Sequence, residues 1–370
     1  MLRGPIRGDQ MDTTKPLVLA DDGDLLDDLL RLAAAAGCEL ERAPDAEAAR
    51  QRWSAAPMVV LDPTAAADCA AAGMPRRGGV LVVCPGEPPP PVWRSAVAVG
   101  AEKVLALPAA EHWLVSALAD AHESPGPVAG RVLTVLGGRG GGGASVLASA
   151  VAIASARRAQ RTLLVDCDPL GGGLDLVLGV EEAEGMRWPE LALTGGRVAA
   201  SSLHAALPTA VLDGTPLTVL SCDREGRGPE PDAVATVVEA GRRAGETVVC
   251  DLPRHLPDTA LAALDRADLT VLVVPAEVRA CAAAGPVARM ATERGAHLRL
   301  VVRGPAPGGL GVRDVANTLD LPLLAAMRPE PGLASALDRG RLPHRPRGPL
   351  ARTARKILSA LDAAGAGGAR

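Results

Sequence analysis

The sequence predicts an α/β protein built from two doubly wound parallel sheets. Short, continuous apolar runs alternate with stretches of helical periodicity along most of the chain, which is typical of parallel strands buried on both faces. The chain has 370 residues, more than one average domain needs. A segment rich in proline and glycine, residues 123–130, interrupts the alternation and is the predicted linker between two domains.

The first domain is expected over residues 16–122. Apolar runs at 17–20, 58–61, 80–84 and 104–107 are predicted strands, and a weaker strand fits at 39–42. Helices are expected between them, for example at 24–36 and 45–55. Five strand–helix units in about 105 residues indicate a small doubly wound sheet.

The second, larger domain is expected over residues 131–362. Its predicted strands are 132–136, 162–165, 217–220, 247–250, 269–274 and 298–302, and its predicted last helix is 350–361. Residues 1–15 are expected to be a disordered tail, and residues 363–370 a second tail.

Charge and aromatic content argue against several classes of protein. Lys and Arg number 39 against 43 Asp and Glu, and a net charge of −4 is not that of a generally basic nucleic-acid binder. Without Phe or Tyr, a base-stacking surface for single strands is close to excluded. The seven cysteines form no CxxC pair, which predicts reduced, buried thiols in a cytoplasmic protein. No apolar run approaches about 18 residues, so no transmembrane helix is expected.

The strongest motif is a glycine-rich loop between the strand at 132–136 and a helix expected at 146–159. Six of the seven residues from 137 to 143 are glycine, and Ala144 and Ser145 follow. Glycines let backbone N–H groups turn inward around an anion, and the start of a helix adds the positive end of its dipole. The order of strand, loop and helix therefore predicts phosphate binding.

The loop alone leaves two ligand classes open. Gly138, Gly140 and Gly143 fit the GxGxxG pattern of dinucleotide-binding oxidoreductases, with Asp166 near the place of the ribose-binding acid. As a P-loop of the GxxxxGK[ST] type, the same segment has Ala144 where lysine is usual.

Acidic residues after two later strands favour the P-loop interpretation. Asp166 and Asp168 follow one strand, and carboxylates at i and i+2 point the same way and suit metal and water chemistry beside a phosphate. Asp251 ends the strand at 247–250, where P-loop proteins place a carboxylate that holds a Mg²⁺-bound water.

Together these motifs resemble the deviant Walker A loop and switch acids of the ParA/MinD group of P-loop ATPases. Arg139 falls on the signature lysine, Ser145 on the Mg²⁺-binding hydroxyl, and Asp251 and Pro253 on the DxP of switch II. The resemblance implies a nucleotide loop made of Gly138, Arg139, Gly140, Gly141, Gly142, Gly143, Ala144 and Ser145, catalytic acids Asp166, Asp168 and Asp251, and Ser145 and Asp251 as metal ligands.

The chain is most similar to the CpaE-like and septum site-determining (Ssd-type) branch of that group, in which a receiver-like domain comes first. This implies a flavodoxin-like pseudo-receiver domain, then a P-loop NTPase domain that binds ATP and Mg²⁺ in a nucleotide-linked homodimer. The implied role is spatial regulation of septum placement, or of a Tad-type pilus or secretion machine, with division or secretion proteins as partners. The implied location is the cytoplasm, with recruitment to the septum, pole or inner membrane surface.

Ala144 departs from the pattern, because it cannot place a charge on the phosphates as lysine does. Weak or absent ATP hydrolysis is therefore expected. A pseudo-ATPase scaffold that works without nucleotide stays open as an alternative, and a Rossmann-type oxidoreductase as a more distant one.

The first domain resembles a degenerate receiver. Asp21 and Asp22 follow its first strand, and Asp62 stands at the phospho-acceptor position at the end of the strand at 58–61. Leu107 occupies the place of the receiver lysine. The resemblance therefore implies a docking domain, with Asp62 as a phospho-acceptor as the lesser alternative.

Two features near the C-terminus bear on macromolecular partners. Basic residues are frequent between 328 and 356, and the predicted last helix carries an apolar stripe through Leu350, Ile357 and Leu361. A solvated basic face and a helix packed on its own domain are expected. Contacts with nonspecific DNA or with a membrane surface are the lesser alternatives.

Overall fold

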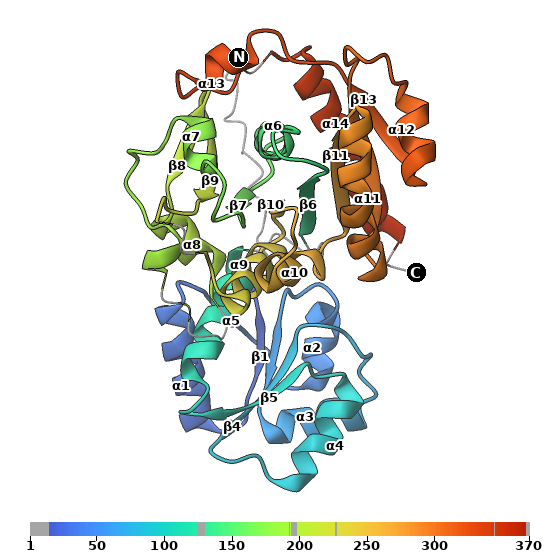
Figure 1. The fold of residues 1–370 in the computed structure, drawn as a ribbon. Coiled ribbons are helices and arrows are strands. Elements are labelled where there is room, and N and C mark those ends of the chain that lie inside the picture. Colours follow the sequence, from blue (N-terminus) through green and yellow to red (C-terminus); the bar gives the residue numbers. More distant parts are fainter. Residues whose placement is uncertain are drawn as a thin grey trace, which may run out of the picture. The chain divides into compact units, whose positions relative to one another are not determined.

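The computed structural model describes residues 15–123, 130–191, 193, 198–225, 228–343 and 345–367. The chain forms two compact units, Met1–Val128 and Ala129–Arg370, each with its own sheet (Figure 1). Residues 1–14 of the expected tail and 124–129 of the expected linker lie outside the described residues.

The first unit contains a five-stranded parallel sheet with the order β2-β1-β3-β4-β5. Its strands are β1 (Leu17–Leu19), β2 (Glu41–Arg42), β3 (Val59–Leu61), β4 (Val80–Pro85) and β5 (Lys103–Leu107). Its helices are α1 (Gly23–Ala35), α2 (Ala46–Trp53), α3 (Pro63–Ala71), α4 (Pro90–Val99) and α5 (Glu111–Glu123). This strand order is that of flavodoxin-like sheets, so the predicted fold of the first domain is confirmed.

Aspartates begin three helices of this unit. Asp22, Asp45 and Asp62 are the N-caps of α1, α2 and α3, and each accepts a backbone N–H from the first turn. Alternate residues of the central strands point into two buried clusters, one on each face of the sheet. Because both faces are covered, these strands are continuous apolar runs in the sequence.

The second unit contains an eight-stranded sheet with the order β13-β12-β11-β6-β10-β7-β9-β8. Its strands are β6 (Arg131–Gly137), β7 (Thr162–Asp166), β8 (Thr209–Leu212), β9 (Thr215–Leu220), β10 (Thr247–Leu252), β11 (Leu269–Pro275), β12 (Leu298–Arg303) and β13 (Leu323–Met327). Its helices are α6 (Ala144–Ala156), α7 (Leu174–Leu178), the 3₁₀ helix η1 (Trp188–Glu190), α8 (Ala200–Ala206), α9 (Pro231–Arg243), α10 (Asp258–Leu264), α11 (Val278–Glu293), α12 (Val312–Leu319), α13 (Leu333–Leu337) and α14 (Pro349–Gly367).

The sequence missed the two edge strands of this sheet. β8 pairs antiparallel with β9, and the turn between them is Asp213-Gly214, with φ values of +50° and +79°. An Asp-Gly pair at positive φ between two apolar runs is a known hairpin signal that could have revealed β8. β13 pairs only with β12, and its first two side chains are exposed or half-buried, so it lacks the continuous apolar run of an interior strand.

Two helices differ in length from expectation. α6 begins at Ala144, directly after the glycine loop, rather than at residue 146. α14 continues to Gly367, so residues 363–367, expected to be a tail, are helical instead. The final residues, 368–370, lie outside the described part of the chain.

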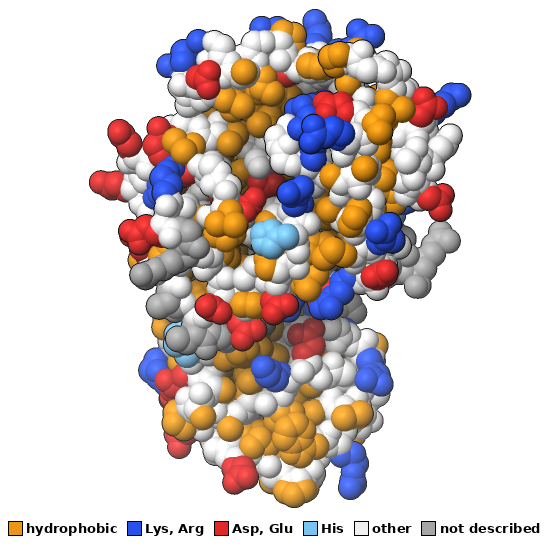
Figure 2. All heavy atoms as spheres, in the orientation of Figure 1, with side chains coloured by type: hydrophobic (Ala, Val, Ile, Leu, Met, Phe, Trp, Pro, Cys, Tyr) orange, Lys and Arg blue, Asp and Glu red, His pale blue; other side chains and the backbone are white. Residues whose placement is uncertain are grey.

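The apolar stripe of α14 packs on the second unit. Leu350, Ala354, Ile357, Leu358 and Leu361 are all buried in a cluster that also contains residues of α6. Within the described ranges, none of the helices has the length and apolar character needed to cross a bilayer. On the face drawn in Figure 2, basic and acidic side chains are interspersed rather than gathered into a field of one sign.

Candidate functional site

The glycine loop connects β6 to α6 at the carboxyl end of the sheet, and its turn requires glycine at several points. The Gly138 N–H donates to the Val273 carbonyl at 2.9 Å, and the Gly142 N–H donates to the Arg139 carbonyl at 3.2 Å. A Cβ on Gly138 would lie 2.8 Å from the Cβ of Ala284. Gly141 and Gly143 have φ values of +70° and +95°, which favour glycine.

The start of α6 leaves backbone donors free. Its first intrahelical bond runs from the Leu147 N–H to the Gly143 carbonyl, at 3.0 Å. The N–H groups of Ala144, Ser145 and Val146 therefore have no acceptor within the helix, and Gly143 has no side chain to cap them. These donors and the positive end of the helix dipole suit an anion.

Ser145 and Asp251 meet beside this helix start. The Asp251 carboxyl, 4 % exposed on β10, lies close enough to the Ser145 side chain for Ser145 to lower its pKa. Burial raises the pKa of Asp251 well above its usual range, the neighbouring charges of Asp166 and Asp168 raise it further, and only the nearby Ser145 side chain acts against them. A cation at this place would relieve the cost of the buried charge.

Asp166 is held by the protein itself. Its carboxylate accepts the N–H groups of Asp168 at 3.0 Å and Leu174 at 3.1 Å, and the hydroxyl of Ser221 at 3.2 Å. Burial raises its pKa to about 6, against the lowering effect of these hydrogen bonds. Asp166 thus organises the segment that follows β7.

Asp168 differs from Asp166 in its exposure. It is half-buried, and one of its carboxylate oxygens accepts the Leu170 N–H at 3.1 Å. Of the two acids at the end of β7, Asp168 is therefore the one that can reach a water molecule.

Arg139, at the signature position, is bound within its own chain. Its guanidinium pairs with Glu277 at 3.0 Å and donates to the Gly140 carbonyl at 3.2 Å. Glu277 lies just before α11, so this ion pair ties the glycine loop to the segment after β11.

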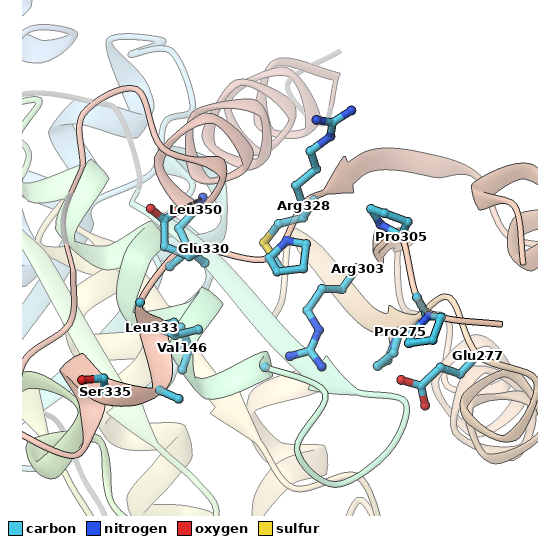
Figure 3. A pocket seen from close by; sticks show the side chains of 17 residues that line it. Val146, Pro275, Glu277, Arg303, Pro305, Arg328, Glu330, Leu333, Ser335 and Leu350 are labelled. Carbon is cyan, nitrogen blue, oxygen red and sulfur yellow. Dashed lines mark hydrogen bonds between the residues drawn. The ribbon is translucent and has the colours of Figure 1, made fainter. Parts of the chain in front are cut away.

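A cavity of about 610 Å³ opens beside the helix start (Figure 3). Its walls come from the start of α6, the segments after β11 and β12, and the chain between β13 and α14. Arg303 and Arg328 both line it. Figure 3 shows Arg303 turned toward the glycine loop and Arg328 turned away from it. The sequence named no residue for this part of the site.

The residues present fit a magnesium–phosphate group better than a metal held by protein alone. Among the described residues, no group of three or more His, Cys, Asp or Glu side chains is arranged to hold a metal ion. Mg²⁺ typically uses one or two protein ligands and takes the rest from phosphates and water. The Ser145 hydroxyl and the Asp251 carboxylate are such a pair.

The strand order argues against the dinucleotide interpretation. In that sheet the acid that binds ribose follows the strand next to the glycine loop. Here β10 lies between β6 and β7, so Asp166 is two strands away, about 10 Å at usual strand spacing. Asp251 instead lies on the strand next to the glycine loop, opposite Val135 of β6.

In the first unit, Asp62 is buried and serves as a cap. Its carboxylate accepts the N–H groups of Asp21 at 2.7 Å, Asp22 at 3.2 Å and Ala65 at 2.6 Å. Asp22 in turn caps α1. These contacts occupy both oxygens of Asp62, so the acids predicted from the receiver resemblance come together as a hydrogen-bonded cap.

Comparison with known proteins identifies both units. Residues 18–129 match the family model described as the Rv3660c-like, CheY-like N-terminal domain. The uncharacterized protein Rv3660c of Mycobacterium tuberculosis is 47% identical over 353 residues, which cover 95% of this chain and 98% of the relative.

Solved structures match the second unit. A chain of the MinC:MinD cell division protein complex from Aquifex aeolicus is similar with a TM-score of 0.52 and 21% identity, over 62% of this chain and 96% of that chain. The ParA family ATPase from Chlorobium tepidum TLS gives a TM-score of 0.53 and 17% identity, over 64% and 99%. The chain therefore belongs to the family of Rv3660c-like proteins, and it joins a CheY-like N-terminal domain to a domain with the MinD/ParA fold.

Proposed function

We propose that the second unit binds Mg·ATP and acts as a nucleotide-dependent spatial regulator. The observation that carries the proposal is the meeting of three parts at one place: the free N–H groups at the start of α6, the neighbouring Ser145 and Asp251 side chains, and the cavity of about 610 Å³. The loop would hold the phosphates, Ser145 and Asp251 would hold Mg²⁺ directly or through water, and the cavity would take the nucleoside.

Hydrolysis, where it occurs, would depend on Asp168. Asp166 already accepts several hydrogen bonds from the protein, whereas Asp168 is half-buried and can position a water molecule. Because Ala144 cannot contact the phosphates as a lysine would, we propose that turnover is slow relative to binding.

The MinD/ParA fold supports a role in placing a division septum or a pilus or secretion machine. In this proposal two chains form a nucleotide-linked homodimer, and partner proteins recognise the dimer. Arg139 would reach across that dimer only after its ion pair with Glu277 breaks. Sedimentation velocity of the full chain with and without Mg·ATP tests this step, and an unchanged monomer would contradict it.

Calorimetry on the full chain tests nucleotide binding, with Mg·ATP and NAD as ligands and Gly143→Val as the disrupted loop. Valine is strained at a φ of +95° and would press on Arg303. Gly295→Val is the matched control, since Gly295 has a φ of +82° in open space outside the site. We expect micromolar Mg·ATP binding, lost in Gly143→Val and kept in Gly295→Val.

The second candidate is a scaffold that works without nucleotide, and Ala144 is the observation in its favour. If the full chain is folded and monodisperse but binds no Mg·ATP, the result would favour the scaffold over the nucleotide-dependent regulator. Preference for NAD over ATP would instead revive the oxidoreductase.

A further inference from the structure

We propose that Arg303, at the end of β12, supplies the phosphate-facing positive charge that Ala144 cannot supply. The inference rests on the proposed function, because it assigns a residue to the same nucleotide site. The charge would come from the opposite wall of the cavity rather than from the glycine loop itself.

The geometry brings Arg303 to the loop. Arg303 is the last residue of β12, and it stands beside Pro275 of β11 in the sheet. Its side chain crosses the cavity, so that its Nη1 atom lies 3.2 Å from the position a Cβ on Gly143 would occupy (Figure 3). Gly143 is the N-cap of α6, so the guanidinium lies where the free N–H groups begin.

Arg303 is also the cation that is free to act there. In the part of the chain that the structure describes, no hydrogen bond or ion pair engages its guanidinium. The charge of Arg139 is already compensated by Glu277, and Arg328 points away from the loop. An unpaired arginine beside the positive end of a helix is unfavourable until an anion arrives, so the arrangement favours an anionic ligand.

The chemistry suits a polyphosphate. A guanidinium is always charged and presents its N–H groups in a planar fork that matches phosphate oxygens. Because Arg303 lines the cavity and contacts the loop, its fork would bind the phosphates nearest the helix start. We therefore expect it to contribute to ATP and ADP binding, and not to adenosine binding.

Calorimetry on the full chain with Mg·ATP, Mg·ADP and adenosine tests the assignment. Loss of a charge-assisted hydrogen bond predicts that Arg303→Ala binds ATP and ADP about 10- to 100-fold more weakly. Adenosine affinity should not change. Arg303→Lys should keep part of the affinity. Arg299→Ala, which changes a half-buried arginine of the same strand that does not line the cavity, should bind like the wild type.

A charge restored on the loop gives the sharpest readout. Ala144→Lys in the Arg303→Ala background returns a cation to the usual P-loop position, and we expect ATP affinity to recover. The unfolding temperature of ligand-free Arg303→Ala should stay at or slightly above that of the wild type, since no described partner is lost.

The outcomes separate the two proposals. Wild type that binds no nucleotide overturns the proposed function and this inference together. If the wild type binds ATP and Arg303→Ala binds it equally tightly, only the inference is overturned. Equal losses for ATP and adenosine in Arg303→Ala would also overturn it, because they would assign Arg303 to the nucleoside rather than to the phosphates.

Discussion

At the scale of single residues, Asp62 shows how a side chain at a phospho-acceptor position serves the fold. Its buried carboxylate bonds three backbone N–H groups from two segments, which joins the end of β1 to the start of α3. A phosphoryl group on either oxygen would have to break such bonds. The geometry therefore argues against phosphorylation of Asp62.

We expect Asp62→Ala to destabilise the protein by about 1–2 kcal/mol, the range of a lost N-cap. Asp45→Ala is the matched control, because Asp45 is an exposed cap that accepts only the Ala48 N–H among the described contacts, and its loss should cost less. Urea unfolding measures both. Incorporation of phosphate from acetyl phosphate at Asp62 would contradict this account.

Asp166 predicts a pH dependence of stability. Its pKa is raised from 3.8 to about 6 by burial, so between pH 4 and 6 the folded state binds more protons than the unfolded state. The contribution of Asp166 to stability therefore falls as pH rises through this window, by up to about 3 kcal/mol. Above pH 6 it becomes constant.

Urea unfolding at pH 4, 5, 6 and 7, without Mg²⁺ or nucleotide, measures this effect as the difference between wild type and Asp166→Asn. Asparagine does not titrate, so the difference isolates the carboxyl from other acids such as Asp265, whose pKa is lowered by Arg294. Parallel pH curves for the two proteins would show that Asp166 has no shifted pKa.

At the scale of elements, α14 is a packing helix. Ile357 is fully buried in the cluster that α14 shares with α6, whereas the neighbouring Lys356 is exposed. We expect Ile357→Ala to cost about 2–5 kcal/mol, as large-to-small core changes do, and Lys356→Ala to cost little. Denaturant unfolding measures both. Cosedimentation of the wild type with anionic vesicles would contradict a helix whose apolar face is already covered.

The interior elements were predictable because their signals are strong and local. Strands buried on both faces are continuous apolar runs, and this pattern located β6, β7, β10 and β11 to within one or two residues. Edge strands lack it, since β8 and β13 expose part of their side chains to water. The Asp213-Gly214 turn is visible in the sequence, but the sequence alone did not show that β8 pairs with β9 across it.

The site was predictable only in part for the same physical reason. The glycine loop, Ser145 and Asp251 follow a known spacing, and the sheet brings Ser145 and Asp251 into contact. Arg303 follows no such spacing, because it reaches the loop through the register of β11 with β12 and the direction of one long side chain. Arg303 matters only because position 144 is alanine where P-loops usually have lysine. The sequence showed that this lysine is missing, but it did not show which residue could take its place.

At the scale of the whole molecule, each unit has its own core. The four buried clusters of the described residues each lie within one unit, two about the first sheet and two about the second. Separate cores that share no buried cluster are expected to unfold separately. The proposed nucleotide site lies in the second unit, so nucleotide binding should raise the midpoint temperature of only one of the two unfolding transitions.

We therefore expect two calorimetric unfolding transitions in the full chain, with Mg·ATP raising only the one that belongs to Ala129–Arg370. A ligand at one hundred times its Kd stabilises the state it binds by about 2.7 kcal/mol, or roughly 5–10 °C for a unit of this size. The assignment can be made with Ile357→Ala, which should lower the ATP-sensitive transition, and Asp62→Ala, which should lower the other. A single transition shifted by both variants would mean that the two units unfold as one, and that nucleotide binding is felt by the receiver-like unit through folding stability itself.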